Sequence, residues 1–411
     1  MSLIRDPALA EEGRKKIHWA KAYMPTLNEI EKAFAKAKPF AGIRIATSVH
    51  LEAKTANLAL VLKAGGAEVH ATGCNPLSTQ DDVAAGLASM GVECYAIHGC
   101  TDAEYEEQLT AALLSKPHLV LDDGGDLCEL LHGKCKDMAS CLMGATEETT
   151  TGVLRLHARE KADKLAYPVY AVNDADMKHL FDNRYGTGES VWTALMATTN
   201  VQLSGKTAVV AGYGWCGRGV AMKAAGLGMR VIVTEINPVK AIEAVMDGFS
   251  VMTMDEAAPL GDFFVTVTGV RDIIVQRHFD VMKDGAILSN AGHFDVEVDV
   301  AALKAKCKAV EQRNNIMGYL QPDGRVLNVI AEGRLCNIAA GNGHPVEIMD
   351  MSFAVQALAL EKMLAEHKTL ENKVYEVPHE IDERVSAYKL AALGLKIDQL
   401  TTAQVAYLNH F

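Results

Sequence analysis

Short apolar runs alternate with amphipathic stretches along most of the chain, a pattern typical of parallel sheets covered by helices. In the first third, four runs have the length and composition of buried strands: Gly42–Val49, Ala67–Ala71, Glu93–Ile97 and Leu119–Leu121. Between them, Ala53–Ala64 and Asp102–Leu114 have the length and polarity of helices. This part of the chain therefore predicts an α/β unit with a parallel sheet.

A second unit of the same kind begins near Lys206. Its expected strands are Thr207–Val210, Arg230–Val233, Phe263–Val267 and Ala286–Leu288. Beyond Ala340 the chain is expected to be helical through Met351–Leu364 and to end in a charged, amphipathic tail from Lys373. The tail is suited to packing against another subunit.

Polar and glycine-rich segments follow several strands of the first unit. They are His50, Thr72-Gly73-Cys74-Asn75 and Asp122-Asp123-Gly124-Gly125-Asp126. Ligands of open α/β sheets bind beyond the carboxyl ends of the strands. These segments are therefore candidates for a functional site.

The composition limits the partners of the chain. With 411 residues, 49% of them apolar, it is long enough for two large domains. The formal net charge of −12 argues against nucleic-acid and anionic-membrane partners, and no apolar run is long enough to predict a transmembrane helix. Nine cysteines without a CxxC pair favour a reducing compartment over disulfides or a zinc site, and no signal peptide is visible. We therefore expect a cytoplasmic enzyme with no metal.

A GxGxxG motif opens the second unit. The strand Thr207–Val210 runs into Gly212-Tyr213-Gly214-Trp215-Cys216-Gly217, and Glu235 follows about 20 residues later, just past the next strand. The glycines permit a tight turn, close approach to a pyrophosphate and helix packing, while the acid accepts hydrogen bonds from ribose hydroxyls and repels a 2′-phosphate. The sequence therefore predicts NAD as cofactor, with a purely structural glycine turn as the alternative.

These observations predict two doubly wound, Rossmann-like α/β domains with a helical C-terminal tail. The expected division is a substrate domain at residues 1–184, completed by 343–372, an NAD domain at 185–342, and a tail at 373–411. Hinges are expected near residues 183–205 and at Gly341-Asn342-Gly343.

Nine sequence blocks, in order through nearly the whole chain, carry a resemblance to a known family. They are HLEAKT (50–55), NPLSTQDD (75–82), DDGGD (122–126), EETTTGV (147–153), FDNRYG (181–186), AGYG–CGRG (211–219), GHFDVEVDV (292–300), AEGRL–N (331–337) and GHP (343–345). On these blocks the chain resembles the S-adenosylhomocysteine hydrolases.

The resemblance implies an enzyme that cleaves the thioether between a nucleoside C5′ and homocysteine, in S-adenosylhomocysteine, S-inosylhomocysteine or both. In this family NAD stays bound and oxidises the ribose 3′ carbon, which makes the C4′ proton acidic. Homocysteine leaves, water adds and the hydride returns. The resemblance also implies a homotetramer and a role in the methyl cycle. A net NAD-dependent dehydrogenase and an inactive NAD-binding homologue are the alternatives.

The resemblance assigns catalysis to His50, Asp123, Glu148, Lys178 and Asp182. Lys178 would take the 3′-hydroxyl proton, with its pKa depressed by the adjacent nicotinamide, while Asp182 and Glu148 bind ribose hydroxyls. Asp123 would take the C4′ proton and His50 would serve the leaving sulfur or the attacking water, although these two roles could be exchanged. The alternatives are an exposed i,i+4 pair for Lys178 and Asp182, and structural hydrogen bonds for His50 and Asp123.

Further residues are implied to bind substrate or cofactor. The substrate set is Glu52, Lys54, Thr55, Asn183, His293, His344 and Met349. The NAD set is Thr149, Thr150, Thr151, Asn183, Gly212, Gly214, Gly217, Glu235, Asn290 and Asn337. Within these sets Asn337 would bind the nicotinamide carboxamide and Asn183 would support Lys178. Taken alone, residues 147–151 would form a helix cap, and the two histidines could be loop residues without a role.

Three departures from the family pattern bear on function. Thr187 stands where the best-known members have cysteine, and the chain ends at Phe411 without the tail that completes a neighbour's NAD site in the eukaryotic type. Lys54 stands where many members have a glutamate that accepts from the adenine 6-amino group. A lysine has three donors and no acceptor, so Lys54 and Glu52 together suit hypoxanthine. Adenine also fits if Glu52 takes the amino group, and Lys54 could instead pair only with Glu52, so the base stays open.

Overall fold

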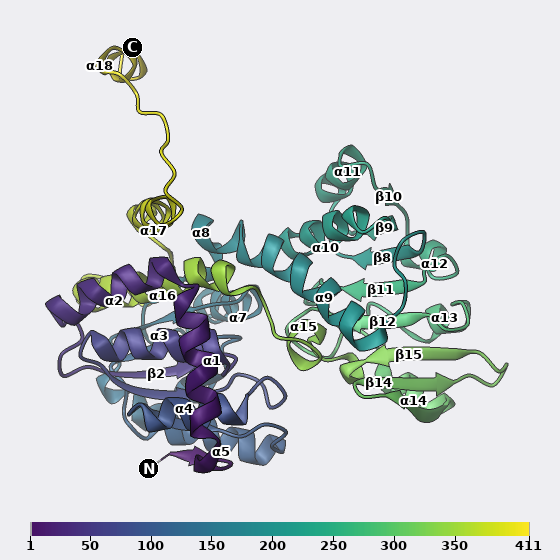
Figure 1. Cartoon of the computed structure of the whole chain (residues 1–411), viewed down its shortest axis with the longest axis horizontal. Coiled ribbons are helices and arrows are strands. Elements are labelled where there is room, and N and C mark those ends of the chain that lie inside the picture. Colours follow the sequence, from purple (N-terminus) through teal and green to yellow (C-terminus); the bar gives the residue numbers. More distant parts are fainter. Residues whose placement is uncertain (1, 411) are drawn as a thin grey trace.

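Two sheets, one in each half of the chain, form the framework of the computed structural model, which describes residues 2–410 (Figure 1). The first sheet has the strand order β1-β4-β3-β2-β5-β6-β7-β16, and its described pairs are parallel. Its strands are β1 (Leu3–Ile4), β2 (Arg44–Ser48), β3 (Glu68–Thr72), β4 (Glu93–Ala96), β5 (Leu119–Asp122), β6 (Gly144–Glu147), β7 (Val169–Ala171) and β16 (Val374–Glu376). The strand order reverses between β2 and β5, which is where open α/β sheets bind ligands.

Helices cover both faces of the first sheet, because alternate residues of its strands enter two separate apolar clusters. Ile45 and Leu119 pack on one side, whereas Ala46 and Val120 pack on the other. The helices are α1 (Ala10–Ala22), α2 (Pro25–Ala37), α3 (Ala53–Ala64), α4 (Asp81–Ser89), α5 (Asp102–Leu113), α6 (Asp126–His132), α7 (Thr150–Lys161), α8 (Asp176–His179), α16 (Val346–Glu366) and α17 (His379–Ala392). Short 3₁₀ turns lie at Pro7–Leu9, Lys136–Cys141, Val172–Asp174 and Ala331–Gly333.

The second sheet has the strand order β10-β9-β8-β11-β12-β15-β14-β13, in which β14 runs antiparallel to both of its neighbours. Its strands are β8 (Thr207–Ala211), β9 (Arg230–Thr234), β10 (Ser250–Val251), β11 (Phe263–Thr266), β12 (Ile287–Asn290), β13 (Lys308–Arg313), β14 (Ile316–Leu320) and β15 (Val326–Ile330). Its helices are α10 (Trp215–Gly226), α11 (Pro238–Met246), α12 (Met254–Ala257), α13 (Gln276–Phe279) and α14 (Val300–Lys306). The predicted fold class, two Rossmann-like α/β units, is confirmed.

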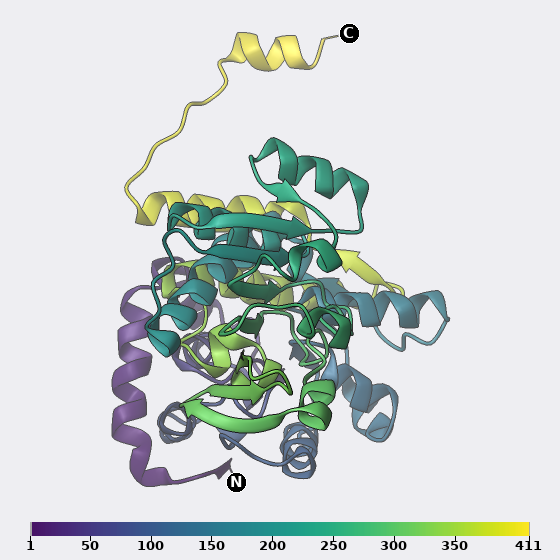
Figure 2. The same cartoon turned by 90° about the vertical axis from the view of Figure 1, so that its right-hand side faces the viewer.

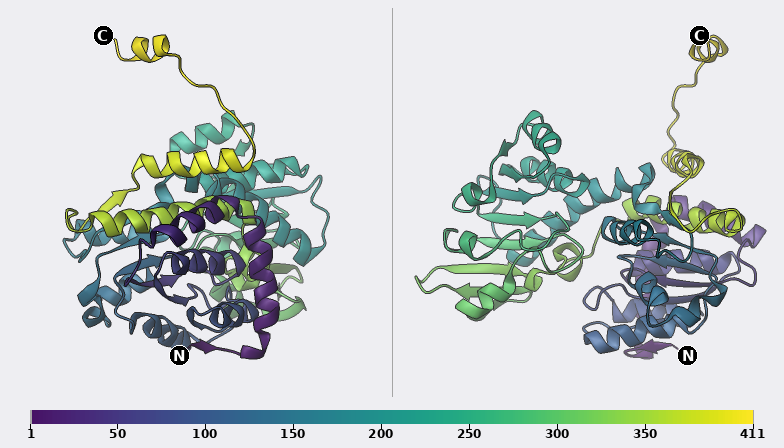
Figure 3. Two further views of the ribbon diagram at one scale, coloured as in Figure 1. Left: turned by 60° about the vertical axis from the view of Figure 1, so that its left-hand side comes forward. Right: turned by 180° about the vertical axis from the view of Figure 1, so that it is seen from behind.

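The chain crosses between the halves twice (Figure 3). The first crossing is a π-helical turn, Asp182–Gly186, that runs directly into α9 (Thr187–Thr199). The second follows α15 (Cys336–Ala339) and leads through Gly341–Gly343 into α16. Most of the expected hinge at residues 183–205 is therefore helix.

The C-terminal segment is helical, as predicted, and projects from the body of the molecule (Figures 1 and 2). After α17, residues 395–400 run without helix or strand to α18 (Thr402–Leu408). Among the described residues, no helix has both the length and the apolar character required to span a membrane.

Glycines allow α9 and α10 to approach closely where the first crossing enters the second half. A Cβ atom on Gly219 would lie 1.7 Å from the carbonyl oxygen of Arg184, and one on Gly188 would lie 2.4 Å from that of Gly219. Backbone atoms fill both positions, so a methyl group could enter only if the helices separate. The placement of the dinucleotide motif against the crossing depends on these glycines.

We predict that Gly219→Ala lowers the free energy of unfolding by about 1–3 kcal/mol, because overpacking a close helix contact has costs of this order. The matched control is Gly226→Ala at the end of the same helix, where a Cβ atom would meet nothing within 4 Å. The control is expected to be neutral or stabilising by up to about 1 kcal/mol. Denaturant unfolding measures both, and equal effects of the two substitutions would contradict the account.

Candidate active site

The carboxyl ends of both sheets border one cavity of about 1490 Å³ between the halves. His50 follows β2, Asp123 follows β5 and Glu148 follows β6, while Gly212 and Glu235 follow β8 and β9. The predicted site residues that line the cavity are His50, Glu52, Lys54, Thr55, Asp123, Glu148, Thr149, Thr150, Thr151, Lys178, Asp182, Asn183, Gly212, Gly214, Glu235, His293, Asn337, His344 and Met349. The other two predicted residues, Gly217 and Asn290, are buried and do not line the cavity.

Asp123 gathers two histidines and a thiol. Its Oδ2 lies 3.8 Å from His50 Nε2 and accepts a hydrogen bond from Cys74 Sγ at 3.3 Å, while its Oδ1 lies 3.7 Å from His293 Nδ1. Burial lowers the pKa of His50, which the nearby Asp123 partly opposes, so its ring is neutral at physiological pH. Within residues 2–410, His50 Nδ1 is buried and has no hydrogen-bond partner.

Lys178 lies at the centre of a buried polar cluster. Its Nζ donates to Asn183 Oδ1 at 2.8 Å and to Asn173 Oδ1 at 3.3 Å, and it lies 3.4 Å from Asp182 Oδ2 and 3.8 Å from Glu148 Oε1. Burial favours the neutral amine, but Asp182 and Glu148 outweigh it and raise the pKa of Lys178. The predicted depression of this pKa concerns the complex with NAD, and it stays a prediction. The alternative of an exposed surface pair is wrong, because Lys178 and Asp182 are both buried.

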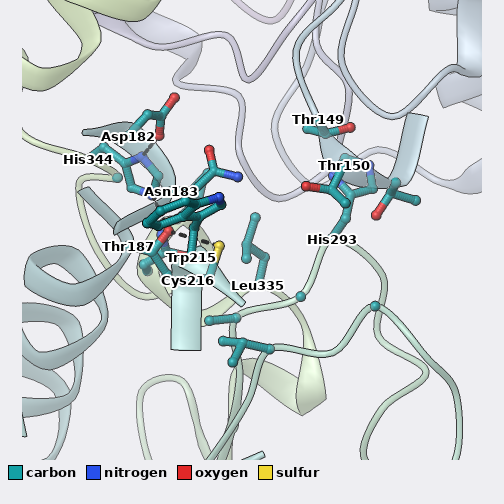
Figure 4. A pocket seen from close by; sticks show the side chains of 18 of the residues that line it. Thr149, Thr150, Asp182, Asn183, Thr187, Trp215, Cys216, His293, Leu335 and His344 are labelled. Atoms are coloured by element: carbon teal, nitrogen blue, oxygen red, sulfur yellow. Dashed lines mark hydrogen bonds and ion pairs between the residues drawn. The ribbon is translucent and has the colours of Figure 1, made fainter. Parts of the chain in front are cut away.

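Asp182 is held as an anion by contacts from three segments. His344 Nδ1 contacts its Oδ1, while the Ser352 hydroxyl donates to its Oδ2 at 2.9 Å, the same oxygen that faces Lys178. Burial would favour the neutral acid, but Lys178 and His344 outweigh it and hold the pKa of Asp182 well below its usual range. The polar contacts extend from His344 to Thr187, whose hydroxyl lies 3.4 Å from His344 Nε2 (Figure 4).

Glu148 differs from Asp182 in charge although both face Lys178. Burial raises the pKa of Glu148 to about 8, so the carboxyl group is mostly protonated at neutral pH. The side-chain amide of Gln356, on α16, donates to Glu148 Oε2 at 2.5 Å. Glu148 Oε1 has no hydrogen-bond partner in the part of the chain that the structure describes. The cluster thus combines an anionic carboxylate with a neutral carboxyl group.

Glu52 and Lys54 form a closed pair at the start of α3. The Glu52 carboxylate caps the helix, accepting from the backbone N–H groups of Lys54 at 3.1 Å and Thr55 at 3.4 Å. Lys54 Nζ lies 3.1 Å from Glu52 Oε2 and donates to the carbonyl oxygen of Asn342 at 3.0 Å. Two of the three ammonium N–H groups therefore have partners, and Lys54 also touches the second crossing.

The GxGxxG turn has the shape that a pyrophosphate requires. Gly212 has a φ of +101°, a conformation that L side chains rarely adopt, and a Cβ atom on Gly217 would lie 2.0 Å from the Gly212 carbonyl oxygen. A Cβ atom on Gly214 would meet nothing within 4 Å, and this glycine lines the cavity. The turn is therefore packed on its inner side and open on the side of the cavity.

Glu235 and Asn337 offer acceptors farther along this half. Three backbone N–H groups, of Tyr213, Ile236 and Asn237, donate to the Glu235 carboxylate, and they hold its pKa below the usual range despite partial burial. Asn337 Nδ2 donates to Ser190 Oγ at 3.0 Å, while its buried Oδ1 has no partner among residues 2–410. An unpaired acceptor suits a carboxamide N–H₂ group, so the residues present fit NAD.

Two predicted NAD residues have clear local roles in the chain itself. Thr149 is the N-cap of α7, because its hydroxyl accepts from the backbone N–H of Gly152 at 3.2 Å, so the predicted helix cap is confirmed. Asn290, which is fully buried, donates to the carbonyl oxygens of Gly292 and Gly333 and braces the loop after β12. Figure 4 shows Thr149, Thr150 and His293 on the opposite side of the cavity from Asp182.

Four polar side chains that hydrogen-bond to the proposed catalytic side chains are absent from the assigned set: Cys74, Asn173, Ser352 and Gln356. Ser352 and Gln356 lie four residues apart in an otherwise apolar stretch of α16, so that they share one helix face. Two buried polar residues at this spacing are a signal that could have identified them. Cys74 lies in one of the segments after a strand that the sequence indicated as a candidate site, although no role was assigned to it, and Asn173 also follows a strand, β7.

We predict that Gly214→Ala weakens NAD binding about tenfold or more, because the methyl group would occupy space that the pyrophosphate needs. The backbone at Gly214 (φ −72°) suits alanine, so the free energy of unfolding is expected to stay within about 0.5 kcal/mol of the original. Gly217→Ala is the contrasting variant, because it should destabilise the fold. Calorimetric titration with NAD measures the affinity, and an unchanged Kd for Gly214→Ala would contradict the placement of the pyrophosphate against Gly214.

Comparison with known proteins agrees with this arrangement. Residues 2–140 match the family model of S-adenosyl-L-homocysteine hydrolase, and residues 183–343 match the model of its NAD-binding domain. The chain is 53% identical to the adenosylhomocysteinase of Pyrococcus abyssi, over 99% of this chain and 96% of the relative. It is 52% identical to the S-inosyl-L-homocysteine hydrolases of Methanopyrus kandleri and Methanocaldococcus jannaschii, over 99% of this chain and 96% and 98% of those relatives. The chain therefore belongs to the S-adenosyl-L-homocysteine hydrolase family and has its NAD-binding domain.

Proposed function

We propose that the chain hydrolyses the thioether of S-adenosyl-L-homocysteine, S-inosyl-L-homocysteine or both to homocysteine and the nucleoside. One observation supports this proposal above the others: three groups of residues line the same cavity. They are the Lys178 cluster, the His50–Asp123 pair, and Gly212 and Gly214 of the GxGxxG turn. A simple dehydrogenase needs no second proton-transfer pair, and an inactive homologue needs neither group. The names of the relatives point to the same reaction.

The cofactor would lie along the second half of the cavity. Gly212 and Gly214 would hold the pyrophosphate, Glu235 the adenosine ribose, and Asn337 the carboxamide. When bound there, NAD supplies reversible hydride exchange with the 3′ carbon of the substrate ribose.

The Lys178 cluster contains one ionised and one neutral carboxyl group, which together can accept a hydrogen bond from one ribose hydroxyl and donate one to the other. Asp182, an anion, accepts a hydrogen bond, whereas Glu148, mostly protonated at neutral pH, donates one. Lys178 is protonated in the protein alone, and it loses that proton more readily when a second positive charge lies beside it. We propose that Lys178 then takes the proton of the 3′-hydroxyl group.

The second proton transfer is assigned to the carboxylate beside His50. Asp123 would take the C4′ proton, which becomes acidic once the 3′ carbon is oxidised. His50 is neutral and has a free Nδ1, so it would serve the leaving sulfur or the attacking water as an acceptor or donor. The hydrogen bond from Cys74 and the nearby His293 keep the Asp123 carboxylate in place.

Lys54 supports a preference for the 6-oxo base. Two of its N–H groups contact Glu52 and the Asn342 carbonyl, which leaves a third N–H for the substrate. An ammonium group accepts no hydrogen bond, so it pairs with the O6 atom of hypoxanthine and not with the 6-amino group of adenine. We propose that the inosyl compound is the better substrate.

The division of labour between the two halves is part of the proposal. Residues 1–184, completed by 343–372, would bind the nucleoside and residues 185–342 would bind NAD, which agrees with the extent of the NAD-domain match. Rotation about the two crossings would close the cavity and exclude water while the 3′ carbon is oxidised. The contact of Lys54 with Asn342 gives the bound base a direct connection to one crossing.

We propose that the protein is a cytoplasmic homotetramer in which the C-terminal segment packs against another copy. Exposed apolar side chains along this segment support the packing: Leu395, Ile397, Leu400, Val405, Tyr407 and Leu408. Free cysteines throughout the described chain agree with a reducing compartment. Light scattering after size exclusion tests the assembly: removal of residues 394–411 should reduce the particle mass, and an unchanged mass would contradict this role.

We predict at least about a fivefold higher kcat/KM for S-inosyl-L-homocysteine than for S-adenosyl-L-homocysteine, because a buried donor that faces an amino group costs about 1–3 kcal/mol. Release of free homocysteine from each compound is the measurement. Lys54→Glu should flatten or reverse the preference, whereas Lys36→Glu, an exposed lysine of α2, should leave it unchanged.

A preference for the adenosyl compound would assign base recognition to Glu52 and overturn the role of Lys54. Release of homocysteine from neither compound would contradict the proposed hydrolase activity itself.

A further inference from the structure

Asp122 and Glu147 are two buried acids directly behind the proposed catalytic residues. They end β5 and β6, where they are neighbours in register across the parallel pair, and both side chains are fully buried. Each precedes a residue of the site, Asp123 in one case and Glu148 in the other. None of the catalytic roles proposed above uses either acid.

The two carboxyl groups hold the loops that carry the site. Asp122 Oδ1 accepts from the backbone N–H of Asp123 at 3.1 Å, and its Oδ2 accepts from that of Cys128 at 2.8 Å. Glu147 Oε1 accepts from the backbone N–H groups of Gly124 at 2.8 Å and Thr149 at 2.9 Å, and from the Thr149 hydroxyl at 2.9 Å. Glu147 therefore ties the loop after β5 to the loop after β6.

The environment of the pair contains little positive charge. Asp123 and Asp126 face it from the loop and from α6, together with the thiol of Cys128, which contacts the Tyr167 hydroxyl. Arg155, a cation on α7, is close enough to Asp122 to interact with it electrostatically, but its hydrogen bonds go to Asp126 Oδ1 and to the Gly124 carbonyl oxygen.

Space around Glu147 is also closed. Within residues 2–410, its Oε2 has no hydrogen-bond partner, and a Cβ atom on Gly152 would lie 2.1 Å from its carboxyl carbon. Two adjacent carboxyl groups in such surroundings cannot both be ionised without a large cost.

We propose that Asp122 and Glu147 share one proton and act as a positioning pair, which holds Asp123 and Glu148 in place and releases them when the proton is lost at alkaline pH. The catalytic part of this inference rests on the proposed function, whereas the shared proton does not. Loss of the proton to solvent changes the pair from one negative charge to two. The repulsion would separate the strand ends and displace both loops.

The titration of the two acids agrees with this geometry. Burial raises the pKa of Asp122 to about 7 and raises that of Glu147 well above its usual range, with the neighbouring Asp122 as a further cause. In the unfolded chain both acids titrate near pH 4. Because the folded pKa values are raised, the contribution of this pair to stability is greatest below about pH 4 and falls as the pH rises through the folded pKa values.

The test compares Glu147→Gln with the original protein between pH 5 and 8. Glutamine keeps the oxygen that accepts from Gly124 and Thr149, places its N–H₂ group at the unpartnered Oε2, and cannot ionise. We expect the Tm of the variant, relative to the original, to rise by about 3 °C or more over this range. Glu107→Gln, an exposed acid of α5, is the control and should show a constant difference.

Activity provides the second readout. The alkaline decline of kcat/KM should begin at a higher pH in Glu147→Gln than in the original protein, while the titration of Glu148 contributes equally to both. A Tm difference that stays flat from pH 5 to 8 would overturn the shared proton. A shifted Tm with an unshifted pH–rate profile would overturn the positioning role.

If Glu147→Gln does not fold, infrared spectroscopy of Glu148→Gln tests the same proton, because this variant lacks the other acid of the site that is protonated at neutral pH. A stretching band of a protonated carboxyl group should persist at pH 6 in this variant and diminish by pH 9, and its absence at pH 6 would overturn the inference. Failure of the proposed function is distinguishable, because it would abolish homocysteine release without affecting the Tm or infrared results.

Discussion

The buried carboxylate of Asp182 is the interaction on which the geometry of the site depends. It contacts Lys178 on α8, four residues away, and two residues far along the chain, His344 on the second crossing and Ser352 on α16. A buried anion is costly unless it is paired and hydrogen-bonded, and here both conditions are met. Because one partner is the proposed proton acceptor and another lies on a crossing, the same interaction orients the chemistry and connects it to the joint between the halves.

In both sheets, a buried acidic side chain holds loops at the carboxyl edge through hydrogen bonds to backbone N–H groups. Glu147 does so in the first sheet, and Glu297 does so in the second, where it accepts from the backbone N–H groups of Thr268 and Gly269 at 2.9 and 2.8 Å. Burial raises the pKa of both acids. Loops that bind ligands are commonly mobile, and these bonds to backbone N–H groups fix their positions at the cost of burying a carboxyl group.

The sequence predicted the elements whose signals are local. Helix α3 begins and ends where its pattern indicates, and the GxGxxG turn lies between β8 and α10 as expected. In contrast, β13, with the sequence KAVEQR, is exposed at every residue, so its pattern contains no apolar run to mark a strand. Strand β6, with the sequence GATE, contains no apolar run, and β7 has only three residues, so neither was predicted.

Long-range contacts set the part of the site that local patterns could not reveal. Gln356 and Glu148 are 208 residues apart, and Lys54 and Asn342 are 288 apart, yet each pair is in direct contact. Family resemblance supplied the proposed catalytic residues that line the cavity, but not their charge states. The raised pKa of Glu148 and the lowered pKa of Asp182 follow from burial and from neighbours that only the folded chain brings together.

The central claim is that this cavity removes and returns a proton at C4′ of the nucleoside during thioether cleavage. The most direct measurement is hydrolysis of S-inosyl-L-homocysteine or S-adenosyl-L-homocysteine by the NAD-loaded enzyme in deuterated water, followed by mass and NMR analysis of the nucleoside. The account predicts one solvent deuterium at C4′, with less incorporation in Asp123→Asn per unit time. A nucleoside released at full rate without deuterium at C4′ would indicate direct displacement at C5′ and would contradict the account.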